Sequence, residues 1–485
     1  MRTRHYHLIG IGGTAMGSLA GLLKAAGHHV TGSDEGVYPP MSTQLRELGI
    51  PYHESYSPAN LVPTPDMVVV GNAISRGNPE LEEVLDRKLP YTSAAQTIKE
   101  EFIRGRYSIA VAGTHGKTTT TSIIAWVLEA AGLAPSFLIG GVAENFGSSF
   151  RLTDSKLFVI EADEYDTAYF DKGPKMWHYM PDIAVVNNVE FDHADIYRDE
   201  EAYRFAFARF INLVPRRGTL VAGWDSPIVR ELAPKSFAPV EGFAYGDDAT
   251  GDDVTTGDPA NAGIVAQPRW TADDVAFQID GMSFTVLRDG KPWGHVRTPL
   301  AGAFNVRNCL AAIATAVRVG AERDRILEGL RTFRSVRRRM EVRGEVRGVT
   351  VIDDFAHHPT AVRETIAAVR QLYPGRRLVA VFEPRSYTAQ RREFQPEYEQ
   401  ALAAADEIVM AGLFHPERYT TKTALDPHEL VAAWRALGRR AAYIPAADEI
   451  VAELTPRLTA GDVVLVMSNG GFGGIHEKLL QALAS

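Results

Sequence analysis

The sequence has very little cysteine, no long apolar run, and fewer basic than acidic residues. Cys309 is the only cysteine among 485 residues, so no intrachain disulfide can form and a reducing compartment is expected. No stretch reaches the roughly 18 consecutive apolar residues of a membrane span. The formal net charge of -9 argues against a general binder of nucleic acid or membrane surfaces. We therefore expect a cytoplasmic protein that neither binds nucleic acid nor inserts into a membrane.

The N-terminus resembles a secretory signal peptide only superficially. Arg2 and Arg4 precede an apolar stretch, but several glycines interrupt that stretch and no A-x-A cleavage site closes it. A strand, a tight turn and a helix explain the same residues better.

The chain is too long for one hydrophobic core, so two to four domains are expected. Short apolar runs alternate with helix-like stretches over most of the length, which indicates an α/β architecture. The candidate strands fall into three groups. We therefore predict three α/β units, at residues 1–104, 105–333 and 334–485.

The pattern changes between Trp270 and Pro299, where apolar and polar residues alternate. Asp-Gly pairs at Asp280 and Asp289 are typical of the tight turns of antiparallel hairpins. The segment 247–261 is polar, acidic and glycine-rich, and is predicted to be a loop. The middle unit is thus expected to contain a β-hairpin region.

A first glycine-rich turn, Gly10-Ile11-Gly12-Gly13, follows a predicted strand and opens a predicted helix. Glycines let the backbone approach a diphosphate, whose negative charge the helix N-terminus favours. Asp34 ends the next strand, where a ribose-binding carboxylate would lie. The pattern does not distinguish a nicotinamide cofactor from another diphosphate ligand, and a glycine turn needed only for packing is the alternative.

A second glycine-rich loop, Val111–Thr120, follows a strand and leads into a helix predicted over Ser122–Ala131. The sequence GTHGKTT is a shorter variant of the common phosphate-binding loop, which has glycine where Val111 stands. Amides of such a loop face phosphate oxygens, while Lys117 brings charge to the β- and γ-phosphates and Thr118 can ligate Mg²⁺. The loop predicts that the chain binds ATP.

Charged side chains follow two further strands. Glu161 closes an apolar strand and is followed by three more acids within five residues. A second apolar strand is followed by Asn188, Glu190, Asp192 and His193. The carboxyl ends of strands collect ligands in α/β sites, so Glu161 and His193 are candidate ligands of metal or substrate. For Asp163 and Asp166 a solvated loop is an equal alternative.

Six motifs together resemble the Mur ligases, which build the peptide of the bacterial cell-wall precursor. The motifs are GTHGKTT at 113–119, EADEYD at 161–166, NNVEFDHADIY at 187–197, GAFNVRN at 302–308, RRME at 338–341 and DDFAHHPT at 353–360. They occur in the family's order along nearly the whole chain. The resemblance implies a Rossmann-like UDP-sugar domain, a central P-loop ATPase-type domain, and a Rossmann-like C-terminal domain for the incoming amino acid or peptide.

Two branches of the family are candidates. Gly71-Asn72-Ala73 and Met467–His476 resemble the peptidoglycan-recycling branch, which joins UDP-N-acetylmuramate to the tripeptide L-alanyl-γ-D-glutamyl-meso-diaminopimelate. The alternative branch adds L-alanine to the same UDP-sugar in peptidoglycan synthesis. Phe304 stands where alanine-adding members usually carry histidine, which favours the tripeptide slightly. Outside the family, an oxidoreductase built on the first turn and a non-catalytic nucleotide-controlled sensor are the competing hypotheses.

The resemblance also implies a role for each matching residue. Transfer of the γ-phosphoryl group of ATP to the lactyl carboxylate would give an acyl phosphate, which the amine attacks. The expected catalytic residues are Lys117, Glu161, His193 and Arg339. The expected ATP contacts are Gly113, Thr114, His115, Gly116, Lys117, Thr118, Thr119, Asn305, Asn308, Arg339 and Asp354. The expected ligands of two Mg²⁺ ions are Thr118, Glu161 and His193.

Contacts to the two other substrates are expected in the outer units. Those to the UDP-sugar are Gly10, Gly12, Gly13, Ser33, Asp34, Asn72 and Ser75. Those to the peptide are Arg385, Ser386, His415 and Asn469, which follow strands of the third unit. The sequence leaves open whether the protein is a monomer or a homodimer.

Overall fold

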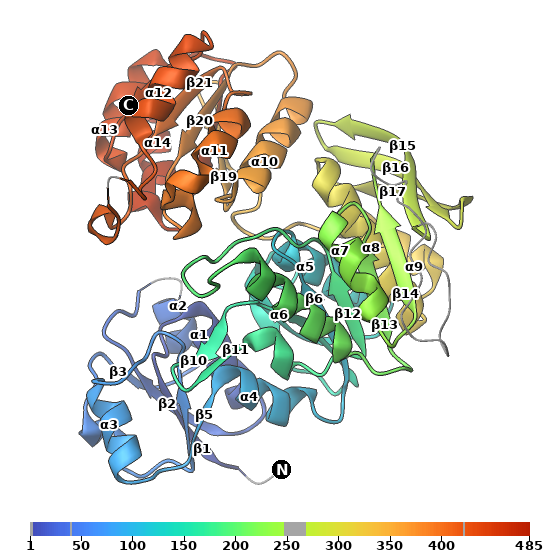
Figure 1. Ribbon diagram of the computed structural model, residues 1–485, viewed down its shortest axis with the longest axis vertical. Helices are drawn as coiled ribbons and strands as arrows, with labels where there is room; N and C mark the ends of the chain where they lie inside the picture. Colours follow the sequence, from blue (N-terminus) through green and yellow to red (C-terminus); the bar gives the residue numbers. More distant parts are fainter. Residues whose placement is uncertain (1–2, 39–40, 247–267, 421) are drawn as a thin grey trace.

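The computed structural model describes residues 3–38, 41–246, 268–420 and 422–485. Three α/β domains follow one another along the chain, coloured from blue to red in Figure 1. This confirms the predicted fold class. The boundaries at 104 and 333 stay predictions, and the loop predicted at 247–261 lies outside the described residues.

The first domain is built on five parallel strands in the order β3-β2-β1-β4-β5. The strands are β1 (His5–Ile9), β2 (His29–Ser33), β3 (Tyr52–His53), β4 (Met67–Val70) and β5 (Tyr91–Ser93). The helices are α1 (Thr14–Ala25), α2 (Met41–Glu47), η1 (Pro58–Leu61), α3 (Pro79–Asp86), α4 (Ala94–Ile98) and η2 (Lys99–Ile103). The strand order reverses beside β1, so the turn that follows β1 lies where open α/β sheets bind ligands.

The central domain has a ten-stranded sheet in the order β17-β16-β15-β14-β13-β12-β6-β9-β7-β8. Its strands are β6 (Tyr107–Ala112), β7 (Ser136–Ala143), β8 (Ser148–Arg151), β9 (Leu157–Glu161), β12 (Ile183–Val186), β13 (Thr219–Gly223), β14 (Val240–Ala244), β15 (Trp270–Gln278), β16 (Gly281–Arg288) and β17 (Lys291–Thr298). A separate hairpin consists of β10 (Asp166–Ala168) and β11 (Asp171–Pro174). In this order, the neighbouring strands from β7 through β9, β6, β12, β13 and β14 to β15 pair in parallel. Antiparallel pairing occurs at both ends of the sheet, between β7 and β8 at one end and among β15, β16 and β17 at the other, and the second end contains the two hairpins that were predicted.

Helices cover both faces of this sheet, which explains why its middle strands are apolar throughout. They are α5 (Lys117–Ala130), η3 (Lys175–His178), α6 (Glu200–Asn212), α7 (Pro227–Leu232), η4 (Ala233–Lys235), α8 (Ala303–Val319) and α9 (Arg323–Thr332). α5, α8 and α9 share one core cluster, while α6 and α7 pack into another. α5 begins at Lys117, five residues before the predicted start.

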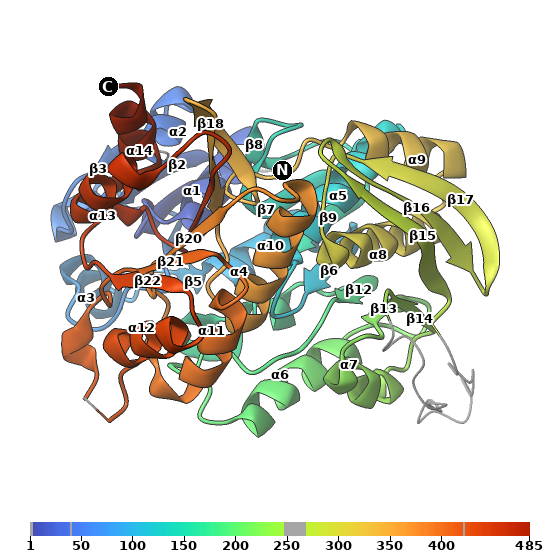
Figure 2. The same ribbon diagram turned by 90° about the horizontal axis from the view of Figure 1, so that it is seen from above.

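The C-terminal domain has six strands in the order β18-β19-β23-β20-β21-β22, of which only β18 runs antiparallel. They are β18 (Glu341–Val346), β19 (Val349–Asp354), β20 (Leu378–Phe382), β21 (Glu407–Met410), β22 (Arg440–Tyr443) and β23 (Val463–Met467). The helices are α10 (Pro359–Leu372), η7 (Thr388–Gln390), η8 (Arg392–Phe394), α11 (Gln395–Leu402), η9 (Pro416–Arg418), α12 (Pro427–Ala436), α13 (Ala447–Leu454), η10 (Thr455–Arg457), η11 (Phe472–Gly474) and α14 (Ile475–Ala484). Figure 2 shows this domain beside the central one, with α10 nearest to it.

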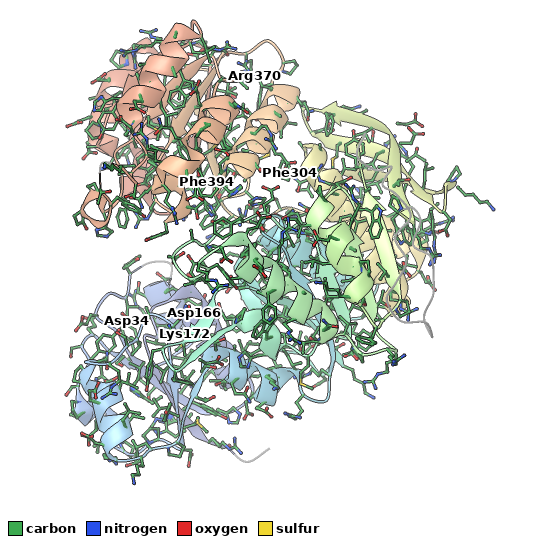
Figure 3. All side chains as sticks on the ribbon, viewed as in Figure 1. Asp34, Asp166, Lys172, Phe304, Arg370 and Phe394 are labelled. Carbon is green, nitrogen blue, oxygen red and sulfur yellow. The ribbon has the colours of Figure 1, made fainter. Side chains whose placement is uncertain are left out.

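The first and central domains share one continuous core cluster, which contains α1 as well as α6 and α7. Ser18 and Ser149 exchange a buried hydrogen bond of 2.7 Å between α1 and β8. The β10–β11 hairpin also reaches the first domain, where Phe170 packs edge-on against Tyr91 at 5.1 Å. Figure 3 shows Asp166 and Lys172 of this hairpin on the side of the first domain. These two domains are therefore joined by packing as well as by the chain.

The central and C-terminal domains meet along α8 and α10, where Arg307 forms an ion pair with Glu364. Figure 3 places Phe304, at the start of α8, on this boundary. Within the described ranges, no helix has both the length and the apolar character needed to cross a membrane.

Candidate functional site

The second glycine-rich loop joins β6 to α5, as the sequence predicts. Gly113 and Gly116 adopt φ angles of 140° and 79°, which residues other than glycine rarely adopt. A Cβ atom on Gly116 would also lie 2.7 Å from Asn308 Oδ1. The loop therefore depends on glycine for both conformation and space, and its amides lie at the N-terminus of α5.

Asparagines hold the loop from behind. The amides of Thr114 and His115 donate to the carbonyl and side-chain oxygens of Asn188, at 3.1 and 2.8 Å. Thr120 donates to Asn308 Oδ1 at 3.1 Å, and Asn308 donates to Asn305 Oδ1 at 2.9 Å. The structure thus brings Asn305 and Asn308 to the loop, and their contact with the nucleotide stays a prediction.

Gly223, at the end of β13, lies against the segment at Asn187 and Asn188 that holds the phosphate loop, so a substitution there tests this support. A Cβ atom on Gly223 would overlap the carbonyl oxygen of Asn187, which is backbone and cannot swing away. We expect Gly223→Ala to displace the segment that holds the loop and to lower the free energy of unfolding by about 1–3 kcal/mol. Chemical denaturation and ATP titration measure both effects. Gly471→Ala, where a Cβ meets nothing within 4 Å, is the control.

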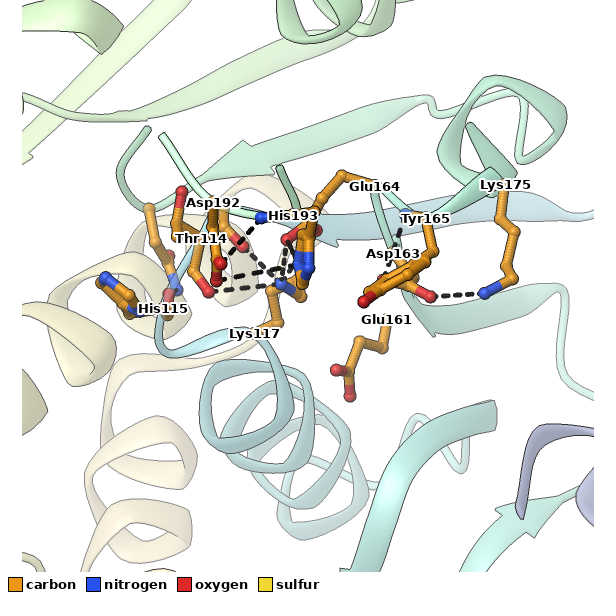
Figure 4. A network of polar contacts seen from close by, with 12 residues as sticks. Thr114, His115, Lys117, Glu161, Asp163, Glu164, Tyr165, Lys175, Asp192 and His193 are labelled. Carbon is orange, nitrogen blue, oxygen red and sulfur yellow. Dashed lines mark hydrogen bonds and ion pairs between the residues drawn. The ribbon is translucent and has the colours of Figure 1, made fainter. Parts of the chain in front are cut away.

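Lys117 lies at the centre of the polar network in Figure 4. Its ammonium donates to the carbonyl oxygen of Gly113 at 2.7 Å and to Glu164 Oε1 at 2.9 Å. Burial alone would lower the pKa of Lys117, but the negative charges of Glu164 and Asp163 outweigh burial and raise it. Lys117 is therefore a fixed positive charge beside the phosphate loop.

Glu164 is a fully buried carboxylate for which the sequence predicted no role. It contacts Lys117 on one side and His193 Nε2 on the other, at 3.1 Å from Oε1. Burial opposes its ionisation, but the charges of Lys117 and His193 lower its pKa overall. Thr118, Glu161 and His193 were expected together as the ligands of two Mg²⁺ ions, and in the structure the carboxylates that pair with His193 are Glu164 and Asp192.

Glu161 instead faces Thr118, the residue that follows Lys117. The Thr118 hydroxyl donates to Glu161 Oε1 at 3.0 Å, and the amide of Gly140 donates to Oε2 at 2.8 Å. Burial raises the pKa of Glu161, although the positive charge of Lys117 opposes this shift. A hydroxyl and a carboxylate are hard oxygen donors, which is the ligand chemistry that Mg²⁺ prefers.

Arg339 enters this site from the C-terminal domain, and its guanidinium donates to Thr118 Oγ1 at 3.3 Å. Asp354 accepts hydrogen bonds from the amides of Met340 and Ala356, at 2.8 and 2.7 Å. It therefore holds the turn that carries Arg339. Met340 has a φ angle of 51°, a strained value for a residue with a side chain. The domain arrangement thus places a second cation at the phosphate loop.

The first glycine turn and Asp34 also lie together. The amide of Gly12 donates to Asp34 Oδ2 at 2.8 Å. Gly10 lies against Ile74, a residue that stands between Asn72 and Ser75 in the sequence. The Ser33 hydroxyl points elsewhere, into a buried hydrogen bond with Glu80. The carbonyl oxygen of Ser33 accepts from the amides of Gly10 and Ile11 at 2.9 and 3.1 Å, so Ser33 supports the turn from inside, while the other expected UDP-sugar contacts share one edge of the sheet.

The expected peptide residues divide into two pairs. Arg385 lies over the Phe414 ring at 3.7 Å and against Gly470, next to Asn469. Within the described chain, Asn469 Oδ1 is buried and has no hydrogen-bond partner. The Ser386 hydroxyl accepts from the amide of Ala389 at 3.0 Å, and His415 forms a surface pair with Glu417. The structure therefore brings Arg385 and Asn469 together, and it uses Ser386 and His415 in local contacts.

Comparison with known proteins identifies the family. Three family models match the chain: Mur ligase family, catalytic domain, over residues 5–106; Mur ligase middle domain over 111–316; and Mur ligase, glutamate ligase domain, over 338–470. A UDP-N-acetylmuramate–L-alanyl-γ-D-glutamyl-meso-2,6-diaminoheptandioate ligase of Haemophilus influenzae is 41% identical over 99% of both chains. A UDP-N-acetylmuramate–L-alanine ligase of Myxococcus xanthus is 34% identical over 99% of this chain and 96% of its own. The crystal structure of a murein peptide ligase from Psychrobacter arcticus is 36% identical, covers 99% of both chains and superposes with a TM-score of 0.72.

The chain belongs to the Mur ligase family. It is therefore an ATP-dependent ligase, and the resemblance inferred from the six motifs is confirmed. The roles of individual residues stay predictions, which the following proposal develops.

Proposed function

We propose that this ligase joins the lactyl carboxylate of UDP-N-acetylmuramate to the amine of L-alanyl-γ-D-glutamyl-meso-diaminopimelate, as a step in peptidoglycan recycling. The observation that carries the proposal is the 41% identity to a relative named for that tripeptide, against 34% for a relative named for L-alanine. Both values extend over nearly the whole chain, including the C-terminal domain, where the acceptor is expected.

The chemistry follows from the difficulty of forming an amide from a carboxylate in water. Lys117 and Arg339 place two cations at the phosphate loop, where they stabilise charge on the transferring γ-phosphoryl oxygens. The lactyl carboxylate attacks the γ-phosphorus, ADP leaves, and an acyl phosphate forms. The peptide amine then adds to the acyl carbon, and phosphate leaves as the amide forms. Closure of the C-terminal domain, which carries Arg339, excludes water from the acyl phosphate.

The residues present fit the expected Mg²⁺ ions. Thr118 and Glu161, whose oxygens lie 3.0 Å apart, would hold the first ion. His193 would hold the second, and the structure adds Glu164 as the carboxylate beside it. When bound, Mg²⁺ supplies positive charge that neutralises the phosphate and carboxylate oxygens.

A comparison of acceptors tests the proposal directly. Purified enzyme with UDP-N-acetylmuramate and ATP receives either the tripeptide or L-alanine, and phosphate release is followed while mass spectrometry identifies the product. We expect kcat/KM to be at least about 100-fold higher for the tripeptide, because its additional groups can bind the C-terminal domain. Faster turnover with L-alanine would overturn the proposal, and ATP binding without any amide product would indicate a sensor.

A further inference from the structure

Three side chains that can ligate a metal ion meet where the phosphate loop touches the C-terminal domain. They are His115 of the loop, Glu190 after β12, and His358 immediately before α10. His115 Nε2 lies 3.3 Å from Glu190 Oε2, and His358 Nδ1 lies 3.6 Å from the same oxygen. One ligand atom from each residue lies within 4.8 Å of the other two. Ligands around one tetrahedral Zn²⁺ lie about 3.3 Å apart, so a small adjustment would bring all three onto one ion.

The protonation states of the cluster suit a metal. Burial lowers the pKa of His358 to about 3, so its ring is neutral, which is the form that ligates a metal. Burial opposes ionisation of Glu190, but the hydrogen bond from His115 holds the pKa of Glu190 at about 2. Two imidazoles and a carboxylate are the donors of zinc sites, whereas the ligands of Mg²⁺ are mostly oxygen atoms.

The surroundings fix the orientation of these donors. The Thr360 hydroxyl donates to Glu190 Oε2 at 2.7 Å, and the rings of His115 and His358 pack at 4.6 Å. The amide of Thr360 makes only a long hydrogen bond of 3.4 Å to His358 Nδ1, which a metal would replace at little cost. The Glu190 side chain is 37% exposed, which leaves an entry path and a position for water. The cluster thus has donors, an outer hydrogen bond and access.

We propose that His115, Glu190 and His358 form a binding site for a divalent transition metal such as Zn²⁺, separate from the expected Mg²⁺ ligands. His115 belongs to the phosphate loop and His358 to the C-terminal domain. A bound ion therefore fastens the two domains together and slows turnover, which requires the domains to open for exchange of substrate and product. The site is defined by these side chains alone and does not depend on the identity of the acceptor peptide.

The experiment is a calorimetric titration of metal-free, full-length protein with ZnCl₂, without nucleotide or UDP-sugar. One tight site per chain is expected. His358→Gln and Glu190→Gln should each weaken it by more than about 100-fold, and Thr360→Val by about 10- to 100-fold because it removes only the outer hydrogen bond. His178→Gln is the matched control, since that ring also pairs with a carboxylate, Asp171 at 3.0 Å, but lies outside the cluster.

Thermal unfolding provides the second readout. Zn²⁺ should raise the Tm of the wild type and of His178→Gln by mass action, and leave that of His358→Gln unchanged. If His358→Gln does not fold, Glu190→Gln decides the question, since it keeps both imidazoles. Absence of stoichiometric binding, or wild-type affinity in the folded cluster variants, would overturn the site. Because no substrate is present, this result is independent of the acceptor assay.

Discussion

Lys117→Ala is expected to abolish ligase turnover, with kcat reduced by about 10³-fold or more and binding of the UDP-sugar nearly unchanged. Lys117 is held by the carbonyl oxygen of Gly113 and by Glu164, so its charge is fixed at the loop before phosphate arrives. Removing a preorganised charge at a developing anion typically costs 10²- to 10³-fold, and phosphoryl transfer depends on such charges more than most reactions. Steady-state phosphate release measures kcat, and calorimetry measures UDP-sugar binding.

The control for this variant is Lys172→Ala. Lys172 also pairs with a carboxylate, Asp166 at 2.6 Å, but lies on the surface hairpin. It should retain activity within about a factor of two, because an exposed ion pair contributes little. Lys117→Met, which keeps most of the side-chain volume, separates loss of charge from loss of packing. Activity retained in both Lys117 variants would contradict the assigned role.

The ATP loop was predictable from the sequence because its signals are local. A buried strand, two glycines and a lysine at fixed spacing define it, and the structure places them at the junction of β6 and α5. The predicted helix nevertheless began too late. The run Thr118–Thr121 consists of β-branched residues, which disfavour helix. In the structure the Thr121 hydroxyl donates to the carbonyl oxygen of Lys117 at 2.7 Å, so this polar group is satisfied within the helix itself.

Elements whose partners are distant in sequence were harder to predict. β7 and β8 form one edge of the central sheet, yet neither was among the predicted strands. Gly140 and Gly141 interrupt the apolar run of β7, and β8 is short and polar. The glycine at 140 is explained only by the fold, since a Cβ atom there would meet Glu161 Oε2 at 2.7 Å.

The sequence also did not predict which of several neighbouring acidic residues lies beside Lys117. The run EADEYD offers four carboxylates, and its composition does not reveal which of them face Lys117. After β9 ends at Glu161 the backbone turns, so that Glu164 becomes fully buried between Lys117 and His193, while Asp163 pairs with Lys175 at 2.6 Å. The contact between the central and C-terminal domains was expected only through the family resemblance, which implied that Arg339 reaches the ATP site, and the structure shows that its partner there is Thr118.

Glu164→Gln therefore tests a role that only the structure indicates, since the sequence predicted none for Glu164. Glutamine keeps the shape of the side chain but removes the negative charge shared by Lys117 and His193. Since Glu164 helps to raise the pKa of His193, its loss should also make that ring less basic. We expect kcat to fall by about 10²- to 10³-fold, with the KM for the UDP-sugar unchanged, because the catalytic cation and the histidine lose their common partner.

Two controls distinguish this role from a general loss of structure. Removing one partner of a buried ion pair can destabilise by about 3–5 kcal/mol, so thermal unfolding must first show that Glu164→Gln is folded at the assay temperature. Asp166→Asn, which changes a neighbouring carboxylate that pairs with surface Lys172, should keep nearly full activity. Glu164→Asp, which restores the charge on a shorter side chain, should recover part of the rate. A folded Glu164→Gln enzyme with near wild-type kcat would show that Glu164 only packs beside the site.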